Sequence, residues 1–169
     1  MAKKIFLLGI IFLFKNILWA EDVSKEDFEK LQIVYAMYDE FKDEFKSVET
    51  IAADELKKIK TKITFVDVRE KAEQAISMIP NAISKDEFEK NKDKYKDSLI
   101  VTYCTIGYRS GVYAEKISKE GFNVRNLKGS LLAWLLSGES IQKNGKETLT
   151  VHVYGKKWNI LPTKYKAIW

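Results

Sequence analysis

The clearest hydrophobic signal in the chain is the run Leu-Ile-Val-Thr-Tyr at 99–103, which lies between two polar segments. Its length and β-rich composition predict a central strand, buried on both faces of a parallel sheet. The same reasoning predicts strands at 48–51 and 63–68, and helices at 53–59 and 85–95. Because strands and helices alternate, we expect an α/β fold with a mostly parallel central sheet and helices on both faces.

A helical spacing of apolar residues precedes these strands. Ser24 and the acidic residues after it are typical of a capped helix start. Large apolar residues then recur at steps of three and four up to Lys46, namely Phe28, Leu31, Tyr35, Tyr38, Phe41 and Phe45. We expect a helix whose apolar stripe covers the domain's own sheet. A helix that binds a partner is the alternative.

The C-terminal segment has a strand pattern followed by an aromatic tail. Asn144 and Gly145 favour a tight hairpin turn, and the alternating residues at 148–154 predict an added strand. The only histidine of the sequence, His152, lies on this strand, and we expect it to be structural. The tail, which contains Trp158, Tyr165 and Trp169, either walls the site or packs on the outside of the sheet.

The first twenty residues have the plan of a secretory signal peptide. A basic start at Lys3 and Lys4 is followed by an uncharged, mostly apolar run at 5–14, and Ala20 precedes two acidic residues. Lys15 ends the run well short of the roughly 20 residues that a membrane-spanning helix needs. We therefore expect a periplasmic or secreted protein, with an uncleaved, membrane-anchored N-terminus as the alternative.

Composition narrows the classes of function. The chain has 169 residues, of which 46% are hydrophobic and 31% charged, as in a globular domain. Loss of the three lysines in 1–20 would lower the formal net charge from +5 to about +2, so the basic balance is weak evidence for any partner. The sequence has no arginine-aromatic patch for nucleic acid and no histidine or cysteine cluster for a metal. We expect no nucleic-acid partner, metal or cofactor.

Candidate chemistry lies directly after the central strand, at the only cysteine of the sequence, Cys104. Helical spacing resumes at Ser110, so 104–109 is predicted to be a strand-to-helix loop. Such a loop directs backbone N–H groups and a helix dipole at its contents, which favours a nucleophilic thiolate. Gly107 lets the loop curl, and Arg109 offers donors for an anionic substrate or a persulfide. An inert, buried cysteine is the alternative.

The segment from Tyr103 to Ser110 resembles the active-site loop of the rhodanese-like sulfurtransferase family. Further similarities follow in the family's order over about 46–136, at Phe65 to Glu70, Glu73, Ile79 to Ala82, Gly121 to Val124, Asn126 to Ser130, and Ala133 with Trp134. Asn81 and Ser130 stand where the family pattern has glycine, and Ser77 and Met78 where it has Gly-His. Together with the patterns described above, the resemblance divides the chain into four expected segments: a signal peptide (1–20), an N-terminal helix (21–46), a rhodanese-like domain (47–138) and a C-terminal extension packing on it (139–169).

The resemblance also implies a reaction. Cys104 would take sulfane sulfur from a small anionic donor such as thiosulfate, form a persulfide, and pass the sulfur to a thiol, cyanide or a protein acceptor. The implied substrate-binding loop consists of Thr105, Ile106, Gly107, Tyr108, Arg109 and Ser110. Alternatives are a redox or persulfide sensor without turnover, a sulfur-relay module, and a phosphatase or arsenate reductase. The resemblance favours sulfur over phosphate, because phosphatase-type members of the superfamily have a loop one residue longer between the cysteine and the arginine.

Asp67 and Arg69 are candidate supporting residues, because they come at the end of a predicted strand, where open α/β sheets place their sites. The interpretation that we prefer is an internal ion pair or a turn cap that holds the neighbouring loop.

Overall fold

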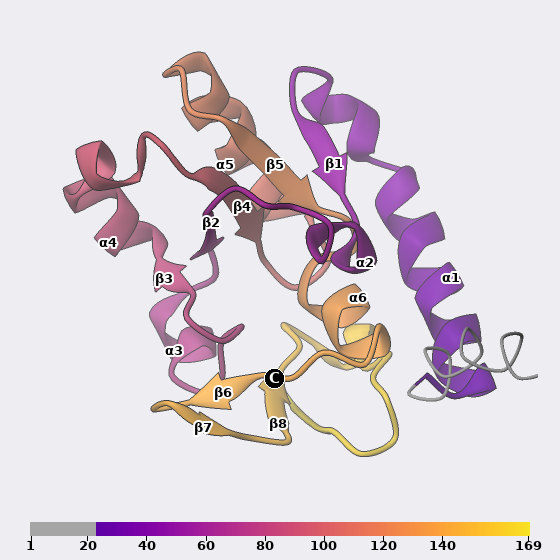
Figure 1. Cartoon of the computed structure of the whole chain (residues 1–169). Coiled ribbons are helices and arrows are strands. Elements are labelled where there is room, and N and C mark those ends of the chain that lie inside the picture. Colours follow the sequence, from indigo (N-terminus) through magenta and orange to yellow (C-terminus); the bar gives the residue numbers. More distant parts are fainter. Residues whose placement is uncertain (1–22) are drawn as a thin grey trace, which may run out of the picture.

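A computed structural model describes residues 23–169 of the chain (Figure 1). The expected signal peptide at 1–20 lies outside the described residues. Five parallel strands form the central sheet in the order β1-β5-β4-β2-β3. Their bounds are β1 (Glu49–Ile51), β2 (Ile63–Asp67), β3 (Ile83–Ser84), β4 (Leu99–Tyr103) and β5 (Val124–Leu127). The predicted α/β fold with a mostly parallel sheet is confirmed.

Both faces of β4 are buried, as its continuous apolar sequence predicts. Leu99, Val101 and Tyr103 belong to one hydrophobic core, whereas Ile100 belongs to a second core on the opposite face. This division follows from the two-residue period of a strand, which sends successive side chains to opposite faces.

Helices cover the two faces of the sheet. Residues of α1 (Lys25–Asp39), α2 (Ala53–Leu56) and α6 (Ser130–Leu136) contribute to the first core. Residues of α4 (Lys85–Lys90) and α5 (Tyr108–Lys119) contribute to the second. The remaining short helices are α3 (Lys71–Gln74) and the 3₁₀ turns η1 (Lys42–Phe45), η2 (Lys92–Tyr95) and η3 (Lys156–Trp158).

The N-terminal helix is shorter than predicted. It ends at Asp39 instead of Lys46, because the backbone of Phe41 leaves the helical region and a separate 3₁₀ turn follows. Phe28, assigned to the apolar stripe, is 56% exposed. The helix packs on α6, and the Tyr38 hydroxyl lies 3.0 Å from the Thr50 hydroxyl on β1. Helix α1 therefore covers its own domain.

Other boundaries shift by a few residues. The helix expected at 53–59 ends at Leu56, and the one expected at 85–95 splits into α4 and η2. At Asn91 the backbone leaves the helical region, which causes the split. Helix α5 begins at Tyr108 instead of Ser110, so the loop between β4 and α5, predicted at 104–109, is two residues shorter.

The C-terminal extension packs across the end of the sheet toward which the arrows of β4 and β5 point (Figure 1). The predicted turn joins β6 (Gln142–Lys143) and β7 (Lys146–Glu147) in an antiparallel pair. The strand expected at 148–154 is shorter, β8 (Thr150–His152), and it pairs in parallel with β9 (Lys166–Ile168). Tyr154 has a positive φ of 67°, a backbone conformation that ends an extended strand.

Within 23–169, no helix is both long and apolar enough to cross a membrane.

Candidate active site

Cys104 lies directly after β4, at the carboxyl edge of the sheet, where open α/β folds place their sites. Its side chain is 2% exposed. The Gly107 N–H donates a hydrogen bond of 3.1 Å to Cys104 Sγ, and the Ser110 hydroxyl lies 3.7 Å from the same sulfur. The N–H groups of Tyr108, Arg109 and Ser110 open α5 and have no partner within that helix. The loop thus presents donors to negative sulfur.

Gly107 is required by the curl of this loop. Its φ is 118°, a conformation that residues with a side chain rarely adopt. A β-carbon at this position would lie 2.6 Å from the Tyr38 ring. The N-terminal helix therefore packs directly against the active-site loop.

Helix α6 and β5 hold the loop from behind. The Leu131 N–H donates to the Cys104 carbonyl and the Ser130 hydroxyl accepts from the Cys104 N–H, at 3.2 and 3.1 Å. The Asn126 side-chain amide donates to the Gly107 carbonyl at 2.8 Å. Ser130 keeps a positive φ of 48° where the resemblance expects glycine. Its hydroxyl supplies a contact to the cysteine backbone that glycine could not make.

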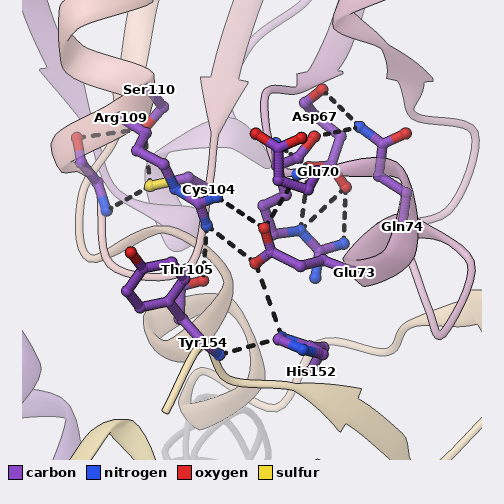
Figure 2. A network of polar contacts seen from close by, with 12 residues as sticks. Asp67, Glu70, Glu73, Gln74, Cys104, Thr105, Arg109, Ser110, His152 and Tyr154 are labelled. Atoms are coloured by element: carbon purple, nitrogen blue, oxygen red, sulfur yellow. Dashed lines mark hydrogen bonds and ion pairs between the residues drawn. The ribbon is translucent and has the colours of Figure 1, made fainter. Parts of the chain in front are cut away.

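Arg109 forms a bidentate ion pair with Glu73, a residue of α3 (Figure 2). Its two terminal nitrogens donate to the two carboxylate oxygens at 2.7 and 2.9 Å, and one of them also lies 3.3 Å from the Thr105 hydroxyl. Burial acts to raise the pKa of Glu73, but the hydrogen bonds from Arg109 and from the Glu70 N–H outweigh it, so the pKa is lowered. Burial likewise opposes the charge of Arg109, yet its Glu73 partner and a Cys104 thiolate raise its pKa. Both groups stay ionised at neutral pH.

Asp67 and Arg69 form a buried ion pair behind the loop. The Arg69 Nη2 lies 2.7 Å from the Asp67 carboxylate and donates to the Ser77 carbonyl at 2.6 Å. Neither residue lines the hollow at Cys104. Arg69 instead borders a separate hollow of about 460 Å³ beside Lys71 and Asp86. This placement corresponds to the internal ion pair that we preferred from the sequence.

A pocket of about 310 Å³ opens at Cys104. Its lining consists of Phe41, Cys104, Thr105, Ile106, Tyr108, Arg109, Tyr154 and Trp158. Gly107 and Ser110, expected in the substrate loop, support the sulfur from behind instead of lining the pocket. Trp158 of the aromatic tail walls the pocket, which is one of the two roles considered, and Leu161 and Tyr165 pack into the hydrophobic core.

His152 and Tyr154 connect the extension to this site (Figure 2). The Arg109 guanidinium lies 5.0 Å from the centre of the Tyr154 ring, within cation-π range. The Tyr154 N–H donates to His152 Nδ1 at 3.1 Å, and His152 Nδ1 also lies 3.8 Å from the Glu73 carboxylate.

The described residues hold no group of three or more histidine, cysteine and carboxylate side chains that could bind a metal.

A comparison with protein families finds the rhodanese-like domain over residues 52–137, half of the chain. The chain belongs to the rhodanese-like domain family. A curated relative, the candidate sulfurtransferase YtwF of Bacillus subtilis, is 34% identical over 104 residues, which are 60% of this chain and 99% of the relative. Family membership agrees with the ordered resemblance in the sequence.

Two solved structures have the same rhodanese-like fold. A thiosulfate sulfurtransferase from Pseudomonas aeruginosa is 19% identical, with a TM-score of 0.51 over 67% of this chain and 23% of its own. A protein of Rhodopseudomonas palustris, described as of unknown function and a possible tyrosine phosphatase, is 20% identical, with a TM-score of 0.50 over 66% of this chain and 93% of its own. At these identities the similarity concerns the fold alone.

Several residues of this rhodanese-like site were not predicted as functional. Glu73 had a signal, since it belongs to the quoted resemblance. Ser130 also had a signal in the sequence, because it stands where the family pattern has glycine. Phe41 and Tyr154 had none, because both lie outside 52–137 and reach the pocket only through the tertiary fold.

Proposed function

We propose that this protein is a sulfurtransferase that carries sulfane sulfur as a persulfide on Cys104. The observation that supports this most directly is the position of Sγ, which accepts the Gly107 N–H and opens on a pocket of about 310 Å³. An N–H donor at 3.1 Å stabilises sulfur when it is negative, both before attack and when it leaves. Membership of the rhodanese-like family and the similarity to a candidate sulfurtransferase support the same chemistry.

In the first half-reaction, the Cys104 thiolate attacks the outer sulfur of thiosulfate. A new S–S bond forms as the bond between the two sulfurs of thiosulfate breaks, and sulfite leaves with its electron pair. The N–H groups at the start of α5, which have no partner within the helix, would receive the charge of the outer persulfide sulfur. Arg109 lines the pocket and adds a cation, although Glu73 shares that charge.

In the second half-reaction, a thiolate or cyanide attacks the outer sulfur of the persulfide. The S–S bond breaks, Cys104 leaves as a thiolate, and the acceptor carries the sulfur away as a persulfide or as thiocyanate. Neither half-reaction needs a general base when the cysteine is already ionised. His152 therefore has no part in this scheme.

Intact-mass measurement after incubation with thiosulfate tests the proposal. We expect the mass of one sulfur atom to be added, and to be lost again on addition of cyanide with formation of thiocyanate. Because the sequence has one cysteine, Cys104→Ser should abolish both events, and its circular dichroism should match the wild type.

Steady-state thiocyanate formation separates the enzyme from the alternatives. Many turnovers for each protein molecule are expected. A single stoichiometric burst without cycling would favour a sensor or relay. Hydrolysis of an aryl phosphate that depends on Cys104, with no added sulfur, would favour a phosphatase.

A further inference from the structure

Three aromatic residues that line the pocket at Cys104 come from segments outside the matched domain. Phe41 lies between α1 and η1, and Tyr154 and Trp158 belong to the C-terminal extension, whereas the family match covers 52–137. Together with Tyr108, these residues surround the cysteine with four aromatic rings. Segments outside the family match thus contribute three of the four aromatic rings at this loop.

The charge of the pocket is low. Among the described residues that line it, Arg109 is the only charged one. Its guanidinium is bound by both oxygens of the buried Glu73 carboxylate and lies against the Tyr154 ring. The Glu73 carboxylate therefore offsets part of this positive charge, so the pocket attracts a small anion less strongly than an unpaired arginine would. Its aromatic walls instead offer contact to an apolar group.

The aromatic walls are held in place. The ring of Tyr108 contacts Phe41 edge to face at 5.5 Å, and its hydroxyl donates to Glu44. Tyr154 has a φ of 67°, which is rare for a tyrosine, and its N–H is bound by His152. Backbone strain of this kind persists where the surrounding structure imposes it, and it concentrates at ligand sites. The chain keeps Tyr154 over the pocket at a conformational cost.

We propose that this pocket selects an organic thiol with an aromatic or apolar group as the sulfur acceptor, and that Tyr154 and Trp158 determine this specificity. The inference rests on the proposed persulfide of Cys104. The acceptor thiolate attacks the outer persulfide sulfur, the S–S bond breaks, and Cys104 leaves as a thiolate. The acceptor leaves as its own persulfide, so no oxidant or reductant is consumed.

The size of the pocket agrees with this acceptor class. A volume of about 310 Å³ is at the lower end of the range for small-molecule sites, which begins at roughly 300 Å³. An acceptor with one ring and a short arm to the thiol would lie between Tyr154 and Trp158 while its sulfur reaches Cys104. A hydrophilic thiol would leave the aromatic rings without contacts and gain no such binding energy.

Single-turnover kinetics with two thiols of similar acidity test the proposal. Cys104 is first loaded with inorganic polysulfide, and the added sulfur is verified by intact mass. Loss of the persulfide is then followed with benzyl mercaptan or with 2-mercaptoethanol. We expect the benzyl thiol to react about tenfold faster at equal thiolate concentration, the discrimination typical of apolar contacts in a pocket.

Variants assign this preference to the extension. Tyr154→Asn removes the ring with a residue that tolerates positive φ, and Trp158→Leu removes the second ring. Each should reduce the ratio of the two rates to about threefold or less, since a ring contact contributes a factor of about two to ten. Trp169→Ala is the matched control, because Trp169 belongs to the same extension, is 59% exposed and does not line the pocket. It should keep the wild-type ratio.

The outcomes are distinct. Equal rates for the two thiols in the wild type, or a ratio unchanged in both ring variants, would overturn the acceptor assignment and leave the persulfide chemistry in place. Failure of Cys104 to take up sulfur, or to pass it to either thiol, would overturn the proposed function and this inference together. Circular dichroism checks the fold of each variant, and Trp158→Leu decides the matter if Tyr154→Asn does not fold.

Discussion

The pair of Arg109 and Glu73 can be tested by a double-mutant cycle with Glu73→Gln and Arg109→Met. Two hydrogen bonds of 2.7 and 2.9 Å join them; the Glu73 side chain is 4% exposed and that of Arg109 31%. Hydrogen bonds to charged groups contribute about 1.5–3 kcal/mol each, and solvent at Arg109 screens part of this. We expect a coupling of about 2 kcal/mol in the free energy of unfolding at pH 7.

The same coupling should depend on pH in one direction. The pKa of Glu73 is lowered in the folded protein, so its ionised form stabilises the fold at any pH above the unfolded value of about 4.3. This stabilisation should be constant from pH 7 to about pH 5, and should be lost as the pH falls through the folded pKa of Glu73.

Unfolding in urea, which does not screen charges, gives the four free energies at each pH. The control cycle uses Lys119 and Glu115, which lie on the surface of α5 with 3.5 Å between their charged atoms. Its coupling should be clearly smaller. A coupling for Arg109 and Glu73 no larger than that control, or one that already declines between pH 7 and pH 5, would refute the interpretation.

Three further predictions concern the fold and the N-terminus. Arg69→Met leaves the buried Asp67 carboxylate unpaired and should cost about 3–5 kcal/mol of unfolding free energy, measured in urea; a loss below about 1 kcal/mol would contradict this. Gly107→Ala places a β-carbon 2.6 Å from the Tyr38 ring at a φ of 118°, so thiocyanate formation should fall at least tenfold, and full activity would show that the loop can relax. For the proposed export, sequencing of the mature protein from its native cell should begin near Glu21, and an intact Met1 in the membrane fraction would favour an anchor.

Two residues that stand where the family pattern has glycine show how far local sequence predicts the backbone conformation. Asn81 and Ser130 both keep positive φ, at 61° and 48°. Asn tolerates this region, so Asn81 agrees with its local sequence. For Ser130 local preference argues against the conformation, and its hydrogen bonds to Cys104 and Leu127 hold it there instead. The tertiary contacts thus override the local preference at a residue that hydrogen-bonds the cysteine backbone.

The sequence alone determined the alternation of strands and helices, the burial of β4, and the position of Cys104 in a strand-to-helix loop. These features depend on the spacing of apolar residues over a few positions, which a single segment carries within itself. Even so, α1 was expected too long, because the stripe at Phe41 and Phe45 continues the helical spacing after the backbone has turned.

Only the tertiary structure decided what surrounds the cysteine. Glu73 binds Arg109 across 36 positions of the chain, and Phe41 and Tyr154 meet at the pocket from opposite ends of it. No local pattern encodes these contacts, because they join side chains that are far apart in the sequence and meet only when the sheet has formed. The position of the extension depends on the shape and apolar surface that the packed domain presents, since Val151, Val153, Leu161 and Tyr165 are buried only against that surface.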